Sequence, residues 1–268
     1  MLNNPIFLLL FLLAIASSVN AQGTFDGFMK KKGESDFVVS YVFEKYNTYK
    51  FGDESQDIEN ATQTYSLYWV GGIQDNLNLV VSIPYLSNSL GSSGLQDGIL
   101  GLRKSIKTQY KEKGMSRSMM SFSMSFPLSN YPTDVMSPIG QKALILQPRY
   151  IYQYHSKGGF FIMGQTGIDF RMIPDAQFGI PVVLKAGYAG RHIYIDLWSD
   201  WMNTLNPGVD EGLNAGNGST WWKMGLSTFV PITDHWGVVL AAGKYFSGRN
   251  IGLAWHLKGA IVYRIPSK

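Results

Sequence analysis

The sequence predicts an all-β protein, an antiparallel transmembrane β-barrel of about twelve strands. Three observations support this fold class. The chain of 268 residues alternates apolar and polar side chains over one segment after another. Aromatic residues make up 14% and charged residues only 16%, which is unusual for a chain that faces water on all sides. The breaks between segments are short and long in turn, as in the barrels of bacterial outer membranes.

The stretch SMMSFSMSFP, residues 118–127, shows the alternation most clearly. Met120, Phe122 and Met124 take every second position, and Ser121 and Ser123 stand between them. Because successive side chains of a strand point to opposite faces, this segment has one apolar face and one small polar face. A barrel with an aqueous interior turns the apolar face to lipid. A secreted soluble β-sandwich would turn it inward, and the pattern leaves that alternative open.

The first 21 residues are expected to be a cleaved secretory signal. The apolar run from Ile6 to Ile15 is too short to span a bilayer, and Val19-Asn20-Ala21 follows it as a cleavage pattern. No Lys or Arg precedes the run, which departs from the usual signal. We expect residues 22–35 to form a periplasmic N-terminal segment and residues 36–268 to form the barrel, in the outer membrane of a Gram-negative bacterium.

The mature chain divides into about twelve alternating segments, each long enough to cross a bilayer as a tilted strand. We expect strands over residues 36–51, 61–73, 77–87, 97–107, 116–127, 143–154, 160–172, 178–189, 193–203, 220–231, 236–246 and 252–265. An even number of strands places both ends of the barrel on the periplasmic side. Ten or fourteen strands are the alternatives if one pair is miscounted.

The breaks between these segments alternate in length. Five are short, at residues 74–76, 111–114, 156–159, 190–191 and 233–235. Longer polar breaks lie between them, at 52–60, 87–94, 130–140 and 206–219, whereas the breaks near Pro174 and at 247–250 are short exceptions. Short turns face the periplasm and longer loops face outward in outer-membrane barrels. The same arrangement is therefore expected here.

The polar faces of the segments supply the residues that we expect inside the barrel. The candidate lumen-lining set, assigned by strand parity, is Arg103, Arg149, Asp169, Arg171, Lys185, Asp196, Asp200, Lys223 and Lys258. The same parity adds Glu44 and Arg264. Basic residues are in excess, so a conducting lumen would prefer anions mildly. Pro148 and Pro181 lie inside two segments and are expected to weaken those strands, because proline cannot donate to the ladder.

Residues 68–106 contain a series of hairpin and loop motifs. Gly72, Asp75 and Leu77 surround a turn, Pro84-Tyr85 ends the following apolar strand, and DGILGLR covers residues 97–103. FPLSNYP follows at 126–132. In these motifs the chain resembles the outer-membrane transporter barrels associated with the meta-pathway of phenol degradation, and elsewhere it is similar only in architecture.

This resemblance implies an outer-membrane barrel that takes up small, hydrophobic or aromatic compounds. The chain departs from many such barrels after Tyr263, where it continues to Ile-Pro-Ser-Lys. Many of those barrels end instead on an aromatic residue that is read during assembly.

Neither catalytic nor metal-ligating residues stand out, so we expect no enzyme, metal site or cofactor. Outer-membrane phospholipases pair a His with a Ser two residues on, whereas His155 and Ser156 are adjacent and fall in an expected turn. His192 and His235 also fall in expected turns, and no His or carboxylate spacing suits a metal ion. The absence of cysteine excludes a disulfide framework. A net charge of +4 is too small to indicate a nucleic-acid partner.

The sequence therefore favours passive uptake or exchange of small molecules through the lumen. The expected partners are outer-membrane lipid, the outer-membrane assembly machinery and a small solute of unknown identity. A non-conducting barrel that serves as a structural or adhesive surface protein shares every feature used above, so it is the alternative.

Overall fold

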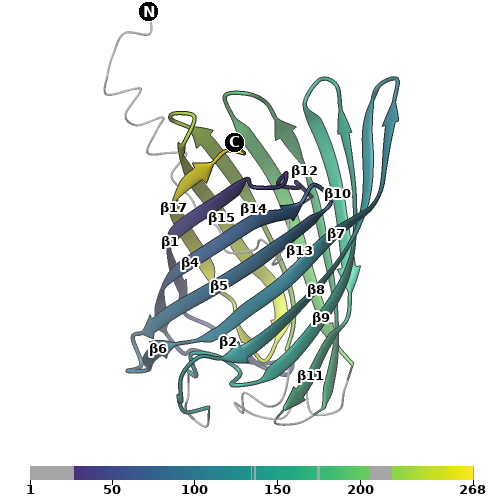
Figure 1. Cartoon of the computed structure of the whole chain (residues 1–268). Helices are drawn as coiled ribbons and strands as arrows, with labels where there is room; N and C mark the ends of the chain where they lie inside the picture. The colour runs from purple at the N-terminus through teal and green to yellow at the C-terminus, as the bar shows by residue number, and fades with distance from the viewer. Residues whose placement is uncertain (1–26, 134, 136, 174–175, 206–218, 268) are drawn as a thin grey trace, which may run out of the picture.

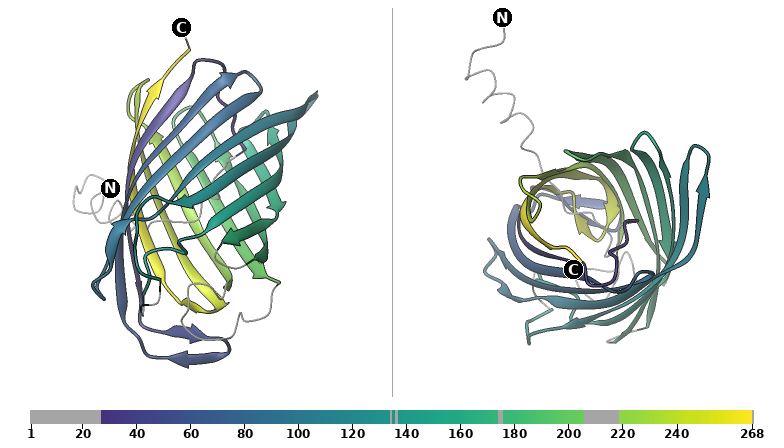
Figure 2. Two further views of the ribbon diagram at one scale, coloured as in Figure 1. Left: turned by 60° about the horizontal axis from the view of Figure 1, so that its bottom comes forward. Right: turned by 45° about the horizontal axis from the view of Figure 1, so that its top comes forward.

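The computed structural model describes residues 27–133, 135, 137–173, 176–205 and 219–267. The expected signal peptide, residues 22–26 and most of the loop over 206–219 lie outside these residues. Throughout the described part of the chain, antiparallel strands form one closed barrel, as expected (Figure 1). In the oblique views of Figure 2 the strands form a ring rather than two packed sheets, so the soluble sandwich is not the fold.

The barrel is twelve-stranded within the described residues, because β10 and β11 are two parts of one strand that pairs with β9 on one side and β12 on the other. Pairing of β1 with β17 closes the ring. Its strands are β1 (Ser35–Tyr46), β4 (Asn60–Gln74), β5 (Leu77–Asn88), β7 (Asp97–Lys111), β8 (Gly114–Pro127), β9 (Leu144–Ser156), β10 (Phe160–Gly167), β11 (Asp169–Ile173), β12 (Gln177–Ala189), β13 (Tyr194–Thr204), β14 (Thr220–Pro231), β15 (Trp236–Arg249) and β17 (Trp255–Ile265).

None of the described residues belongs to a helix long and apolar enough to cross a membrane.

The two ends of the barrel differ in their connections. The hairpins β4–β5, β7–β8, β9–β10, β12–β13 and β14–β15 turn within a few residues at one end, where β1 also begins and β17 ends. We call this the turn end, which is uppermost in Figure 1. Most of the longer connections meet at the opposite end, which we call the loop end. The expected alternation of short turns and longer loops is therefore confirmed.

Several expected boundaries are wrong at the rims of the barrel. The strand expected over 36–51 ends at Tyr46, and the chain continues in β2 (Tyr49–Phe51) and β3 (Glu54–Gln56). In a separate small sheet, β2 pairs with β3 on one side and with β16 (Ile251–Gly252) on the other. Backbone pairing beyond the rim thus separates Tyr49–Phe51 from the barrel strand and makes a strand of Glu54–Gln56, which was expected to lie in the loop over 52–60. A further short strand, β6 (Ser93–Leu95), pairs with β5.

The β7–β8 hairpin is longer than expected and projects beyond its neighbour. Pairing of β5 with β7 stops at Leu77 and Lys104, whereas pairing of β7 with β8 continues to Lys111 and Gly114. The last part of β7 therefore has a partner on one side only among the described residues. Its exposed lysines keep this free edge soluble.

Alternation along the strands gives the barrel an apolar outside. On β8, Met120 and Phe122 are 55% and 50% exposed on the outer surface, whereas Ser121 and Ser123 are buried inside. The assignment of these two faces is confirmed. The same outward exposure recurs on most other barrel strands, for example at Val39, Leu67, Ile162, Leu197 and Ile261.

Aromatic pairs gather on the outer surface near both ends. Trp236 packs on Tyr263 at the turn end, with ring centroids 4.7 Å apart. Trp222 lies between Trp201 and Phe246 at the loop end, at centroid distances of 6.3 and 5.5 Å. Amphipathic rings at both levels form the girdles that flank the apolar band of membrane barrels.

Candidate channel lumen

The N-terminal segment Gly27–Glu34 lies against the inner wall at the turn end. Asn78 of β5 holds its backbone on both sides: the Lys30 N–H donates to Asn78 Oδ1 at 2.9 Å, and Asn78 Nδ2 donates to the Lys30 carbonyl at 2.8 Å. Arg103 Nη2 donates to the Phe28 carbonyl at 2.6 Å. The described part of the segment expected over 22–35 is therefore tied into the barrel rather than free beside it.

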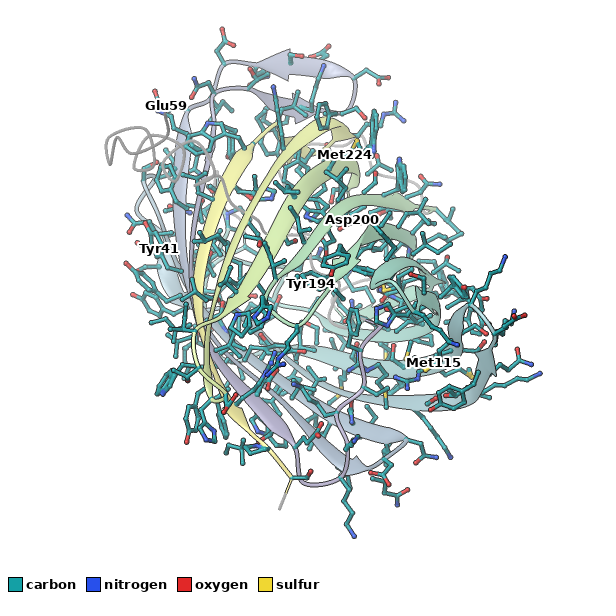
Figure 3. All side chains as sticks on the ribbon, turned by 90° about the horizontal axis from the view of Figure 1, so that it is seen from above. Tyr41, Glu59, Met115, Tyr194, Asp200 and Met224 are labelled. Atoms are coloured by element: carbon teal, nitrogen blue, oxygen red, sulfur yellow. The ribbon has the colours of Figure 1, made fainter. Side chains whose placement is uncertain are left out.

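Phe28 anchors this segment by its ring. The ring meets His155, Phe161 and Tyr194 edge-on, with centroid distances of 6.1, 5.4 and 5.8 Å. These three residues belong to β9, β10 and β13, so the ring bridges separate parts of the wall. Figure 3, viewed from the turn end, shows Tyr194 inside the barrel and Tyr41 on its outer surface.

Apolar side chains fill the interior beside this segment. We call this region the filled half: inward-facing residues of β4, β5, β8, β9, β10 and β12 form a buried cluster, against which Met29 and Tyr68 pack. Its members are Val70, Val80, Met119, Ile151, Met163 and Val183. This side of the interior is packed like the core of a soluble domain.

The remaining interior contains two chambers. The turn-end chamber has a volume of about 650 Å³ and is lined by the N-terminal segment and by residues of β1, β4, β5, β7, β9, β12, β13, β14, β15 and β17. The loop-end chamber has a volume of about 310 Å³ and lies between β8, β9, β10, β11, β12, β13 and β14. Charged side chains line both chambers.

All nine candidate residues face the interior. Arg149 pairs with Asp169, Lys223 with Asp200 at 3.4 Å, and Lys185 with Asp196 at 4.0 Å. The other three lie in different places: Arg103 holds the N-terminal segment, Arg171 lines the loop-end chamber and Lys258 lines the turn-end chamber. Their part in solute passage remains a proposal.

Arg149 supplies a hydrogen bond that Pro148 cannot donate in the strand pairing. The Ile168 N–H donates to the Pro148 carbonyl at 3.1 Å, but Pro148 has no N–H to return the bond. Arg149 Nη1 donates to the Ile168 carbonyl instead, at 2.6 Å. This carbonyl lies at the break between β10 and β11, so Arg149 supplies there the donor that Pro148 lacks.

A row of polar residues lies along the inner wall formed by β13, β14, β15, β17 and β1. Lys223 Nζ lies 3.5 Å from the Tyr245 hydroxyl and 3.4 Å from Asp200 Oδ2. Next to it, His256 Nδ1 is 3.6 Å from Glu44 Oε2. Figure 3 shows Asp200 directed into the barrel. Charges of both signs therefore face each other at mid-barrel.

Two glycines leave space for the inward-facing side chain of Trp198. Trp198 lies against Gly225 and Gly243, and a Cβ at either glycine would fall within 2.1 and 2.6 Å of the indole. The ring therefore lies flat on the wall, stacked beside His256, instead of standing across the interior.

The connection between β8 and β9 is fastened to the inner rim at the loop end. The buried Tyr131 hydroxyl donates to the Asp97 carboxylate and accepts from the Lys142 N–H at 2.7 Å. Asn88 Nδ2 donates to the Ser137 carbonyl at 2.8 Å. Burial, helped by the bond to Asp97, raises the pKa of Tyr131, so its hydroxyl keeps its proton at neutral pH.

Two interior charges were missed by the reading of the sequence. Asp36 accepts from Lys30 Nζ at 2.5 Å and lies 3.6 Å from Arg264 Nε. Asp36 has the same strand parity as Glu44, so this signal was present. Lys30 belongs to a segment without strand periodicity, and no local pattern could have placed it inside.

The structure places His155 differently from the expectation. His155 lies on β9 and faces Phe28, not in a turn as expected. The expectation fails because β9 extends to Ser156. Among the described residues, no group of three His, Asp or Glu could hold a metal ion.

Neither a family model nor a curated protein matches this sequence. Solved structures do match. An outer membrane channel from Pseudomonas putida F1 superposes with a TM-score of 0.68 at 13% identity, covering 88% of this chain and 97% of that one. The KdgM porin superposes with a TM-score of 0.51 at 6% identity, covering 84% of this chain and 98% of that one. At these identities the likeness shows the fold, which is that of an outer-membrane β-barrel.

Proposed function

We propose that this protein is an outer-membrane channel for the passive passage of small solutes. The observation that carries the proposal is the pair of chambers, enclosed by a ring of strands and lined by charged side chains. A soluble or purely structural protein gains little stability from buried charges, because their desolvation is costly. In a barrel with an apolar outer surface and a water-filled interior, water solvates such charges.

Placement in the outer membrane rests on three features. The outer surface is apolar and carries aromatic pairs near both ends. The fold is that of outer-membrane barrels. The expected signal over residues 1–21 provides for export, after which the assembly machinery and lipid are the partners. The turn end then faces the periplasm and the loop end faces outward.

The interior charges favour anions as solutes. Of the nine candidate residues, Arg103, Arg149, Arg171, Lys185, Lys223 and Lys258 are basic, and only Asp169, Asp196 and Asp200 are acidic. Basic rings in a narrow pore concentrate anions, and salt weakens the effect by screening. An aromatic or otherwise hydrophobic solute is the finer proposal, supported by the family resemblance and by the mixed apolar and basic lining of the turn-end chamber.

A non-conducting barrel is the second candidate, favoured by one observation. The N-terminal segment and the filled half occupy much of the interior at the turn end. A conducting path for solutes must run through the turn-end chamber beside this segment. If no such path exists, the barrel does not conduct, and its loops would have a structural or adhesive role.

Single-channel recording of the refolded protein in a planar bilayer separates the two. A channel gives discrete conductance steps whose reversal potential in a salt gradient favours anions. The absence of steps from protein shown to be folded, by its faster migration on a gel before boiling, would support the structural role instead. Clear cation selectivity would contradict the assignment of the interior charges.

A further inference from the structure

Two lysines extend into the turn-end chamber without a hydrogen-bonding partner. Lys185 is 4% exposed, and its Nζ has no hydrogen-bond acceptor among the described residues. The acid nearest to it, Asp196, lies at the 4.0 Å limit of an ion pair. Lys258 makes neither a hydrogen bond nor an ion pair with the part of the chain that the structure describes. Both side chains line the same chamber, where two like charges are unfavourable without an anion or water between them.

The carboxylates near these lysines have other partners. The Tyr194 hydroxyl donates to the Asp196 carboxylate, and Asp36 lies between Lys30 and Arg264. One positive charge at the Lys185–Lys258 pair is therefore uncompensated. Isolated buried ammonium groups are unfavourable unless an anion or water solvates them.

The wall between the two lysines leaves room for a ligand. Strand pairing sets Lys258 opposite Ala241, Ala241 opposite Ser227, and Ser227 opposite Asp196, so these residues form one row around the wall. Small side chains occupy the middle of the row.

The rest of the chamber has an apolar part beside its polar and charged side chains. The apolar part of the lining includes Val38, Tyr68, Val70, Phe229, Val239 and Val262. A volume of about 650 Å³ falls within the range of small-molecule pockets, which place a few polar groups in an apolar lining. The chamber therefore suits a ligand with one charged end and a compact apolar body.

We infer that the turn-end chamber binds small organic monocarboxylates, with the carboxylate between Lys185 and Lys258 and the apolar body against the lining. The inference deepens the proposed function, on which it rests, by naming the solute class. Binding itself does not require conduction, so the two can fail separately.

Isothermal titration of the refolded full chain in detergent tests the inference, with benzoate as the probe and benzyl alcohol as its neutral counterpart. We expect benzoate to bind about tenfold or more tightly than benzyl alcohol, because the alcohol cannot pair with buried charge. Lys258→Met and Lys185→Met should each weaken benzoate binding by about tenfold or more. Lys111→Met removes an exposed charge at the end of β7 and should leave binding unchanged.

Equal binding of benzoate and benzyl alcohol, or full benzoate affinity in Lys258→Met, would overturn the inference. Lys258 is less buried than Lys185, so its variant decides the test if Lys185→Met does not fold. Conductance without benzoate binding would refute this site and leave the channel standing. Benzoate binding without conductance would refute the channel and leave the site standing.

Discussion

The two sides of the barrel interior contrast sharply, although one alternating pattern builds the whole wall. In the filled half, Val80, Met119 and Ile151 are fully buried against the N-terminal segment. Elsewhere on the inner wall, Lys185 and Lys258 line the turn-end chamber. Period-two alternation determines which side chains point inward, but the type of inward residue determines whether the interior becomes a core or a solvated chamber.

The N-terminal segment sharpens this contrast because it adds atoms to one side only. Asn78 and Arg103 hold its backbone, and Phe28 and Met29 extend the apolar packing. The filled half thus gains its tight packing from a segment that is not part of the wall. The charged side receives no such cover from the described residues of this segment beyond Phe28 and Lys30.

A charge placed in each half should have very different effects. Met119→Arg places a cation in the packed apolar cluster, and the loss of a buried group together with an unpaired charge should lower the free energy of unfolding by roughly 3–5 kcal/mol. Ser66→Arg places the same charge at the edge of the turn-end chamber and should cost about 1 kcal/mol or less. Urea titration of both variants in lipid vesicles measures the difference. Equal destabilisation would mean that both halves are packed alike.

Releasing the N-terminal segment should loosen the packing of the filled half and so make it more similar to the rest of the interior. Asn78→Ala removes the side chain that exchanges two hydrogen bonds with Lys30 and leaves backbone groups unpaired, at a cost of about 1–3 kcal/mol. The freed segment should also widen the path, so single-channel conductance should rise. Asn76→Ala, in the exposed β4–β5 turn, is the matched control. If Asn78→Ala and Asn76→Ala have the same conductance, the segment does not limit the path.

At the loop end, a smaller effect is expected from removing a link that holds the β8–β9 connection to the inner rim. Tyr131→Phe removes the hydroxyl that links Asp97 to the Lys142 N–H, which should cost about 1–2 kcal/mol. The β8–β9 connection should then be cut faster by protease, at unchanged barrel fold. Tyr85→Phe removes a hydroxyl on the outer surface and serves as the control. Unaltered proteolysis of the Tyr131 variant would show that this link does not fasten the connection.

The local sequence pattern predicted the strands of the barrel well, but it did not predict the N-terminal segment inside the barrel or the small sheet at its rim. Alternation at residues such as Met120, Ser121, Phe122 and Ser123 gave the strands and their two faces, because that signal is carried by adjacent residues. The contact between Lys30 and Asn78 joins positions 48 residues apart and has no local signature. The β2–β3–β16 sheet likewise joins three short pieces of two loops. Non-local pairing of this kind is not determined by periodicity.

Cysteine accessibility tests the contrast between the halves most directly, because the native chain contains no cysteine. Ser66→Cys lies at the turn-end chamber, Leu67→Cys on the outer surface and Met119→Cys in the filled half. Each variant is folded into lipid vesicles and treated with a negatively charged methanethiosulfonate reagent. We predict that Ser66→Cys reacts more than about tenfold faster than the other two, since only its thiol meets water and nearby positive charge. Equal rates at Ser66→Cys and Met119→Cys would contradict a water-filled chamber.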